Sequence, residues 1–328
     1  MDKTKRIIIA SLVVFVAGYS LFWWYSASQL KVHFQEELAK NSYFSINYDK
    51  IEVGGYPFSL QIKLLNPNFS YQKDNVLVEG TSRDTLVSAS IWNWSALKFQ
   101  ISSPHKFLVS NDEKTYGFEA NLTQGQLNVS DSWSFEISSQ SVFLYENNTP
   151  WADLDAFSGT FQKKTTDATI SFKTSLNALT LQNPPLSMEQ GIQEVRIEGT
   201  ISEVSALESA DDTSLAQTLE NWRDKGGILE IRTALINWPP AALSLEGTLA
   251  LDHTLQPEGA FTTKLMGVPV MLESLEKNKV ISSKERQLFS LASAFMEGED
   301  GITLPITLQE GRLVSGPGTL LKLPRIQW

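Results

Sequence analysis

The clearest alternation of apolar and polar residues in the chain is Leu243-Ser244-Leu245-Glu246-Gly247-Thr248-Leu249-Ala250-Leu251. Leucine occupies every second position except 247, where glycine replaces it. Because successive side chains of a β-strand point to opposite faces, a period of two predicts a strand with one apolar face. We therefore expect this segment to lie in a sheet whose other face is polar.

The same alternation recurs along the chain from residue 43 onward. Its members include Leu60, Ile62 and Leu64, then Tyr116, Phe118, Ala120 and Leu122, and then Val195, Ile197, Gly199 and Ile201. Turn-forming residues separate the runs at 66–68, 183–185 and 256–259. Strands with one apolar face and short turns are typical of antiparallel sheets. The sequence predicts a mainly β protein of the α+β class, with a mostly antiparallel sheet.

Two segments with helical spacing interrupt the strands. Residues 214–225 begin with Ser214 and Gln217, which fit a capping box, and end before two glycines. Residues 282–296 begin with a second capping box, Ser282 and Glu285. A shorter helix is expected around 270–277. We expect these helices to cover an open end or edge of the sheet, and we expect two sub-halves to join near 183–212.

The N-terminal region carries an uncharged run over residues 7–25. As a helix it would be about 28 Å long, close to the thickness of the hydrocarbon core of a bilayer. Lys3, Lys5 and Arg6 precede it, which favours a cytoplasmic N-terminus. The run therefore predicts a single-pass transmembrane helix over 7–25, after a cytoplasmic tip over 1–6. Residues 26–42 would form a helical stalk, and 43–328 a periplasmic β-rich domain.

A cleaved signal peptide is the competing interpretation of the N-terminal region. Residues 26–28, Ser-Ala-Ser, offer a cleavage site of small residues. The length of the run and its bulky end at Trp23, Trp24 and Tyr25 favour a retained anchor, because an aromatic belt is typical of a membrane interface.

Composition narrows the classes of function. The 328 residues carry a formal charge of −10, which argues against nucleic acid as a partner. The chain has no cysteine, so disulfides and thiolate chemistry are excluded. A domain of this size without disulfides is ordinary in a bacterial envelope, and we predict the bacterial inner membrane as its location.

No enzyme signature is present in the sequence. Gly-x-Ser-x-Gly, the P-loop and Gly-x-Gly-x-x-Gly are all missing, and the three histidines, His33, His105 and His253, show no ligand spacing. We therefore assign no catalytic residue, no cofactor and no metal site, and we predict a non-enzymatic protein.

Several motifs carry a family resemblance. They are Leu219-Glu220-Asn221-Trp222-Arg223-Asp224-Lys225-Gly226-Gly227, Asn237-Trp238-Pro239, residues 246–252, residues 255–259, Gly55-Tyr56-Pro57-Phe58, residues 304–306 and residues 311–313. Together they resemble the bacterial family catalogued as domain of unknown function 2125. A looser similarity links the chain to AsmA-like envelope proteins. That resemblance implies a curved β-sheet with an apolar inner face, an inner-membrane helix and a role in lipid transport.

The leading hypothesis for function is a groove that holds or conducts lipid acyl chains, in a protein anchored in the lipid bilayer. Its candidate lining residues are Leu60, Ile62, Leu64, Leu243, Leu245 and Leu249. The alternative is that these side chains form a closed core. Two interpretations likewise remain for Trp92 and Trp94: they lie on a lipid-contacting surface, or they fill the core of the sheet. The rival function is an envelope assembly or scaffold protein that binds other envelope proteins through its sheet edge or stalk.

Overall fold

The computed structural model describes residues 3–40, 44–73, 76–111, 114–130, 132–164, 168–182, 191–207, 214–279, 281–298, 301–315 and 318–326. The chain divides into two compact units. Unit 1 comprises Met1–Asn128 and Phe143–Thr149, and unit 2 comprises Val129–Val142 and Pro150–Trp328. Strand β8 (Ser132–Glu146) contributes residues to both units. Of the junction predicted near 183–212, residues 183–190 and 208–212 lie outside the described residues.

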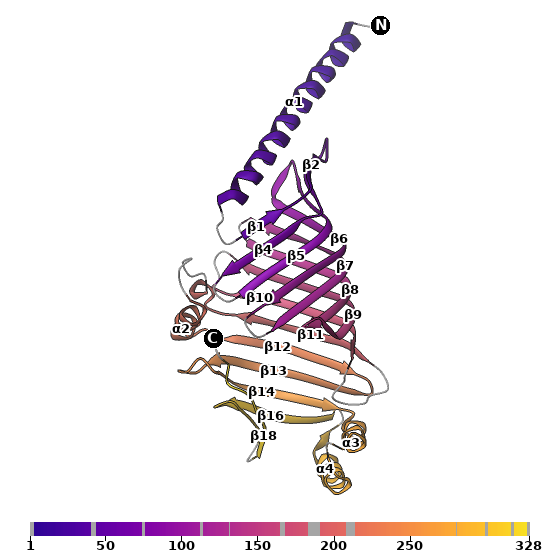
Figure 1. Ribbon diagram of the computed structural model, residues 1–328. Coiled ribbons are helices and arrows are strands. Elements are labelled where there is room, and N and C mark those ends of the chain that lie inside the picture. Colours follow the sequence, from indigo (N-terminus) through magenta and orange to yellow (C-terminus); the bar gives the residue numbers. More distant parts are fainter. Residues whose placement is uncertain are drawn as a thin grey trace. The chain divides into compact units, whose positions relative to one another are not determined.

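Unit 1 is an antiparallel sheet preceded by a long helix (Figure 1). Its elements are α1 (Lys3–Lys40), β1 (Phe44–Asn47), β2 (Lys50–Gly54), β3 (Ser59–Leu65), β4 (Asn68–Lys73), β5 (Val76–Ser90), β6 (Asn93–Ser110) and β7 (Thr115–Val129). The long strand β5 pairs with β4 along its first half and with β3 along its second half. Strand β2 extends the sheet beside β3, β1 pairs with β4, and β6 and β7 follow on the other side of β5.

Unit 2 is built largely from antiparallel pairs between strands that follow one another in the chain. Its strands are β9 (Thr149–Lys164), β10 (Ile170–Leu181), β11 (Ile192–Ile201), β12 (Leu229–Trp238), β13 (Ala241–Leu251), β14 (Pro257–Met266), β15 (Glu297–Gly298), β16 (Gly301–Gln309), β17 (Arg312–Ser315) and β18 (Gly318–Lys322). The pairings described within the two units are antiparallel. The prediction of a mainly β, antiparallel fold is confirmed.

The helices of unit 2 lie at the ends of its strands (Figure 1). They are a short turn η1 (Val204–Ala206), α2 (Leu215–Asp224), α3 (Val268–Lys277) and α4 (Ser283–Met296). Both predicted capping boxes mark helix starts: Ser214 accepts a hydrogen bond from Gln217 N, and Ser282 N donates to Glu285 Oε2 at 2.8 Å. Trp222 connects helix α2 to the residue that follows β11, because its Nε1 donates a hydrogen bond to Ser202 O at 2.7 Å.

Helix α1 differs from the membrane span and separate stalk that the sequence predicted. It is a single helix from Lys3 to Lys40, so it continues through most of the predicted stalk. Within the part of the chain that the structure describes, no helix combines the length and the apolar character that crossing a membrane requires. The transmembrane helix predicted over 7–25 is therefore wrong on this criterion. In the second half of that run, polar side-chain atoms of Tyr19 and Trp23 donate hydrogen bonds to the β2–β3 hairpin.

Gly247 holds β13 unusually close to β14. A Cβ at this position would clash with the carbonyl oxygen of Ala260 and lie 2.8 Å from Phe261 Cα. Backbone atoms cannot move aside as a flexible side chain can, so the close approach requires glycine. At Gly54, in contrast, an added Cβ would meet nothing within 4 Å.

We expect Gly247→Ala to destabilise the protein by about 1–3 kcal/mol, because an inserted methyl group forces the strands apart. Urea unfolding checks this. The matched variant Gly54→Ala should be neutral or stabilising by about 0.4–1 kcal/mol, because it restricts the unfolded chain. Equal effects of the two variants would contradict the argument from close approach.

His105 is a buried titratable residue in unit 1, on β6. Its Nε2 lies 2.8 Å from Thr123 Oγ1, and the ring of Phe107 lies beside it. Burial lowers its pKa below the ordinary value, although the backbone of Ser102 and the charge of Glu119 act the other way. The folded protein therefore favours the neutral imidazole more strongly than the unfolded chain does.

As the pH falls, the imidazole of His105 is protonated in the unfolded chain before it is protonated in the folded protein. The contribution of His105 to the free energy of unfolding should therefore be complete above about pH 6.5 and decrease as the pH drops below that value. We expect His105→Gln to lose part of the stability difference between about pH 7.5 and pH 5.5. Urea unfolding at the two pH values measures it. The control variant is His253→Gln, which removes an exposed imidazole. An unchanged pH dependence in His105→Gln would refute this role.

Candidate functional site

The apolar residues of β13 form continuous rows with their neighbours across unit 2. In an antiparallel sheet, residues directly opposite each other point to the same face. The rows, written from β12 through β13 and β14 to β16, are Ile236–Leu243–Leu265–Ile302, Ala234–Leu245–Thr263–Leu304 and Ile231–Gly247–Phe261–Ile306. We call the residues of these three rows the apolar face. Four strands thus contribute to one surface.

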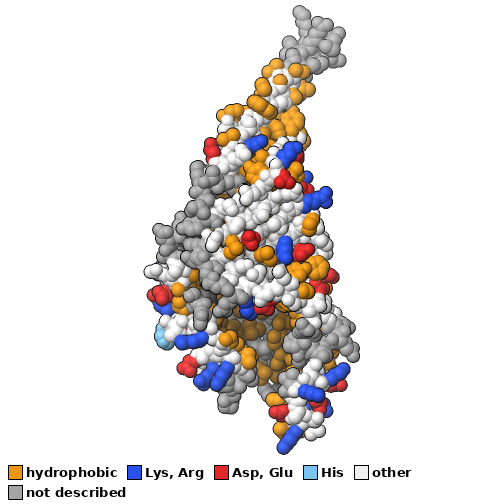
Figure 2. All heavy atoms as spheres, viewed as in Figure 1, with side chains coloured by type: hydrophobic (Ala, Val, Ile, Leu, Met, Phe, Trp, Pro, Cys, Tyr) orange, Lys and Arg blue, Asp and Glu red, His pale blue; other side chains and the backbone are white. Residues whose placement is uncertain are grey.

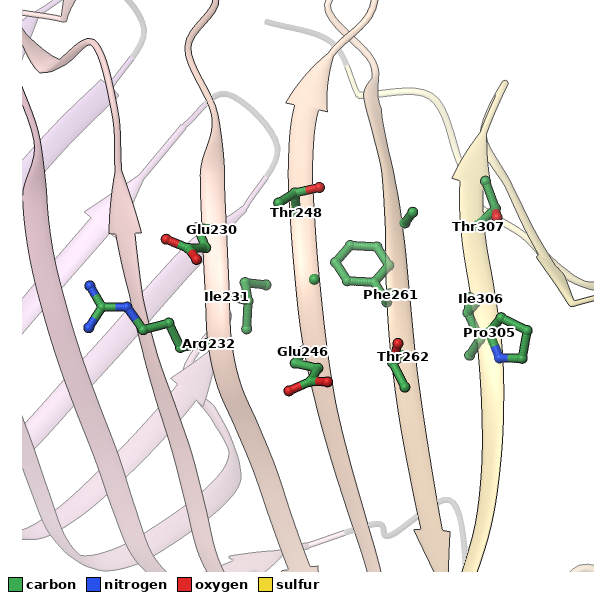
Figure 3. Close-up of a pocket in the computed structure, with 12 residues that line it drawn as sticks. Glu230, Ile231, Arg232, Glu246, Thr248, Phe261, Thr262, Pro305, Ile306 and Thr307 are labelled. Atoms are coloured by element: carbon green, nitrogen blue, oxygen red, sulfur yellow. The ribbon is translucent and has the colours of Figure 1, made fainter.

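The opposite face of the same strands is polar. It presents Glu230, Arg232, Glu246, Thr248 and Thr262, all exposed. An open groove of about 630 Å³ crosses the four strands, and Figure 3 shows its lining residues along β12, β13, β14 and β16. Among the described residues, no group of carboxylates and histidines could hold a metal ion. The groove is lined by polar residues such as Glu230 and Glu246 and also by members of the third row, among them Phe261.

A smaller pocket of about 160 Å³ lies at one end of the apolar face. It is lined almost entirely by apolar atoms, from Ile236, Trp238, Ala241, Ala242, Leu243, Leu265 and Met271. Figure 2 shows hydrophobic side chains gathered in a recess in the lower half of the view, in the region of these strands. Ala241, which lies on the same face of β13 as Leu243, leaves room that a larger side chain would fill. We call this the apolar pocket.

Helix α3 completes the apolar pocket because the chain turns back sharply after β14. Gly267 has a left-handed backbone, with φ of 70°, which glycine adopts without strain. A Cβ there would clash with Pro240 O and lie 2.8 Å from Ala241 Cα, so the turn packs tightly against the β12–β13 hairpin. Pro269 stands at the start of the helix, and Met271, in its first turn, lines the pocket.

The predicted groove residues divide into two groups. Leu60, Ile62 and Leu64 lie on β3 of unit 1 and are buried, with exposed fractions of 1%, 6% and 4%. The members of the second group, on β13 of unit 2, are only partly buried: Leu243, Leu245 and Leu249. Two similar patterns of alternation thus have different surroundings. Whether the β13 residues contact a lipid stays a prediction.

Comparison with known families identifies the chain. A family model described as "Uncharacterized protein conserved in bacteria (DUF2125)" matches residues 23–324. The chain belongs to this family. No curated protein matches it. The family match includes the whole of β12–β14 and therefore both faces described above. The looser similarity to AsmA-like proteins is not part of the match and stays a prediction.

One short sequence motif occurs three times in the chain, and the alternation of apolar and polar residues alone does not single it out. Glu-Gly-Thr occurs at 79–81, 198–200 and 246–248. In each copy the glycine packs under an aromatic ring of the neighbouring strand: Phe69 at Gly80, Phe172 at Gly199 and Phe261 at Gly247. A search for the tripeptide would have found all three, whereas the residues that complete the apolar pocket, Trp238 and Met271, carry no such signal.

Thr263 is the polar member of the apolar face. It is 2% exposed, and its hydroxyl has no hydrogen-bond partner in the described part of the chain. A buried hydroxyl without a partner costs about 1–3 kcal/mol, because its hydration is lost without replacement.

In protein stripped of lipid, Thr263→Val should therefore raise the free energy of unfolding by about 1 kcal/mol. Urea unfolding after detergent exchange measures this. Thr248→Val, on the exposed polar face of β13, should change stability by less than about 0.5 kcal/mol. A loss of stability in Thr263→Val would show that the hydroxyl has a partner.

Proposed function

We propose that this protein binds lipid acyl chains, or an apolar ligand of that shape, on the apolar face of unit 2. The observation that carries the proposal is the partial exposure of Leu243 and Leu245 beside a pocket whose lining is almost entirely apolar. Apolar surface left in contact with water costs about 25 cal/mol per Å² relative to burial. A ligand that covers these rows would recover that free energy.

The size of the apolar pocket suits the end of a hydrocarbon chain rather than a whole lipid. A cavity of about 150 Å³ lined by aliphatic side chains accommodates a benzene-sized group. The apolar pocket, at about 160 Å³, is comparable. The rest of a chain would lie along the rows of the apolar face, which continue from the pocket across β13 and β14. Binding of this kind needs no catalytic residue, so the proposed role is non-enzymatic.

The proposed location is the bacterial envelope, with the β-rich body in the periplasm. Exposed apolar side chains along α1, among them Val14 and Phe15, support contact of this helix with the inner membrane. The absence of cysteine in 328 residues is compatible with a bacterial periplasm. The cytoplasmic N-terminus predicted from Lys3, Lys5 and Arg6 would require a membrane-spanning helix, so it is not part of this proposal.

Leu243→Glu should abolish co-purification of lipid, because burying a carboxylate against hydrocarbon is costly. Full-length protein is purified in detergent, and bound lipid is quantified by mass spectrometry. Because Leu243 is only partly buried, the melting temperature should fall by no more than about 4 °C.

Thr248→Glu provides the matched control, since it places the same charge on the opposite face of β13. It should retain the lipid of the native protein. Equal lipid in all three proteins would exclude the apolar face as the site. Native protein that carries no lipid and cross-links in cells to one envelope protein would favour the scaffold function instead.

A further inference from the structure

Helix α1 is fastened to the tip of the β2–β3 hairpin in unit 1 (Figure 1). Trp23 Nε1 donates a hydrogen bond to Ser59 O at 2.9 Å, and the hydroxyl of Tyr19 donates to Pro57 O. The hydroxyls of Ser20 and Tyr56 lie 2.8 Å apart. These bonds join residues 36 to 38 positions apart in the chain, so they fix the helix against the hairpin.

Aromatic rings extend this contact to a second hairpin tip. Tyr19 stacks on Trp92, in the β5–β6 turn, with ring centroids 6.2 Å apart. Tyr56 meets Trp23 edge-on, with centroids 5.5 Å apart. Gly55, with φ of 97°, makes the β2–β3 turn that places Tyr56 and the next residues at the tip. We call a set of six residues the aromatic collar: Tyr19, Trp23, Tyr56, Phe58, Trp92 and Trp94.

Much of the aromatic collar is open to solvent. Phe58 and Trp92 are each 72% exposed, and Trp94 is 52% exposed. A sheet core therefore does not account for these rings. Figure 2 shows hydrophobic side chains along the described part of α1. Exposed residues of α1, including Phe22 and Trp24, continue the surface along the helix.

The aromatic collar is also free of charged residues. The segments that form it are residues 7–30 of α1, 53–62 around the first tip and 85–97 around the second, and none contains Asp, Glu, Lys or Arg. The chain as a whole carries a charge of −10. Three uncharged segments from distant parts of the sequence thus meet at one place. Tyrosine and tryptophan at the border of an apolar surface are typical of the interface between membrane and water.

We propose that the aromatic collar docks into the headgroup region of a phospholipid bilayer, so that both hairpin tips enter the membrane surface beside α1. Because the collar has no charge, its affinity comes from aromatic and apolar burial. Binding should therefore not depend on anionic lipid or on salt. The inference concerns unit 1 alone and is independent of ligand binding on the apolar face of unit 2.

Site-directed labelling tests this docking, and the absence of native cysteine makes each label unique. Full-length Phe58→Cys and Trp92→Cys, each carrying an environment-sensitive fluorophore, are reconstituted with phosphatidylcholine vesicles. We expect blue-shifted emission and quenching by headgroup nitroxide lipids, unchanged in about 1 M salt, where charge interactions are screened beyond about 3 Å.

Tyr116→Cys is the control, because Tyr116 is an exposed aromatic residue paired with Val109, near the far end of β6. That position is about 50 Å from Trp92 along the strand, and its label should stay in water. In the same assay, Phe58→Ser combined with Trp92→Ser should weaken vesicle binding by about tenfold or more, whereas Tyr116→Ser should not.

Labels at 58 and 92 that stay in water would overturn the proposal, whether or not a label at Leu12→Cys on α1 is quenched. So would a blue shift that requires an added envelope protein and not lipid. Neither result would affect lipid retention at Leu243, so the two proposals can fail separately.

Discussion

The antiparallel register of β12, β13, β14 and β16 is the constraint on which the rest of unit 2 depends. It sets apolar residues of β13 opposite apolar residues on the strands beside it, as at Leu243 and Leu265. A shift of one residue would turn every such side chain to the polar face. Gly247 fixes this register from within, because only glycine permits the close approach to Ala260 and Phe261.

Small residues at the strand ends then add a pocket to the apolar face. Ala241 leaves space, and Gly267 turns α3 back so that Met271 borders that space. The partly exposed rows and the apolar pocket therefore have one origin, which is strict alternation combined with a few small residues at defined positions. The same logic operates in unit 1, where a glycine on β5 packs under an aromatic ring of β4.

Local patterns in the sequence predicted local structure well, because they depend on neighbours within a few residues. Alternation at 243–251 predicted β13, and the capping boxes at Ser214 and Ser282 predicted the starts of α2 and α4. Features that depend on distant segments could not be predicted in this way. Leu60 and Leu243 lie in similar patterns, yet only Leu60 is fully buried. Hydropathy likewise gives no sign that α1 bonds to a hairpin more than 30 residues away.

The most direct test of the central claim is photo-crosslinking of the full-length protein with a phospholipid that carries a diazirine in its acyl chain. Peptide mass spectrometry then locates the labelled residues. The account predicts labels in unit 2 on the apolar face and in its pocket, at Leu243, Leu265 and Met271, and none at Thr248 or Thr262 on the polar face. Equal labelling of both faces, or no label in unit 2, would contradict it.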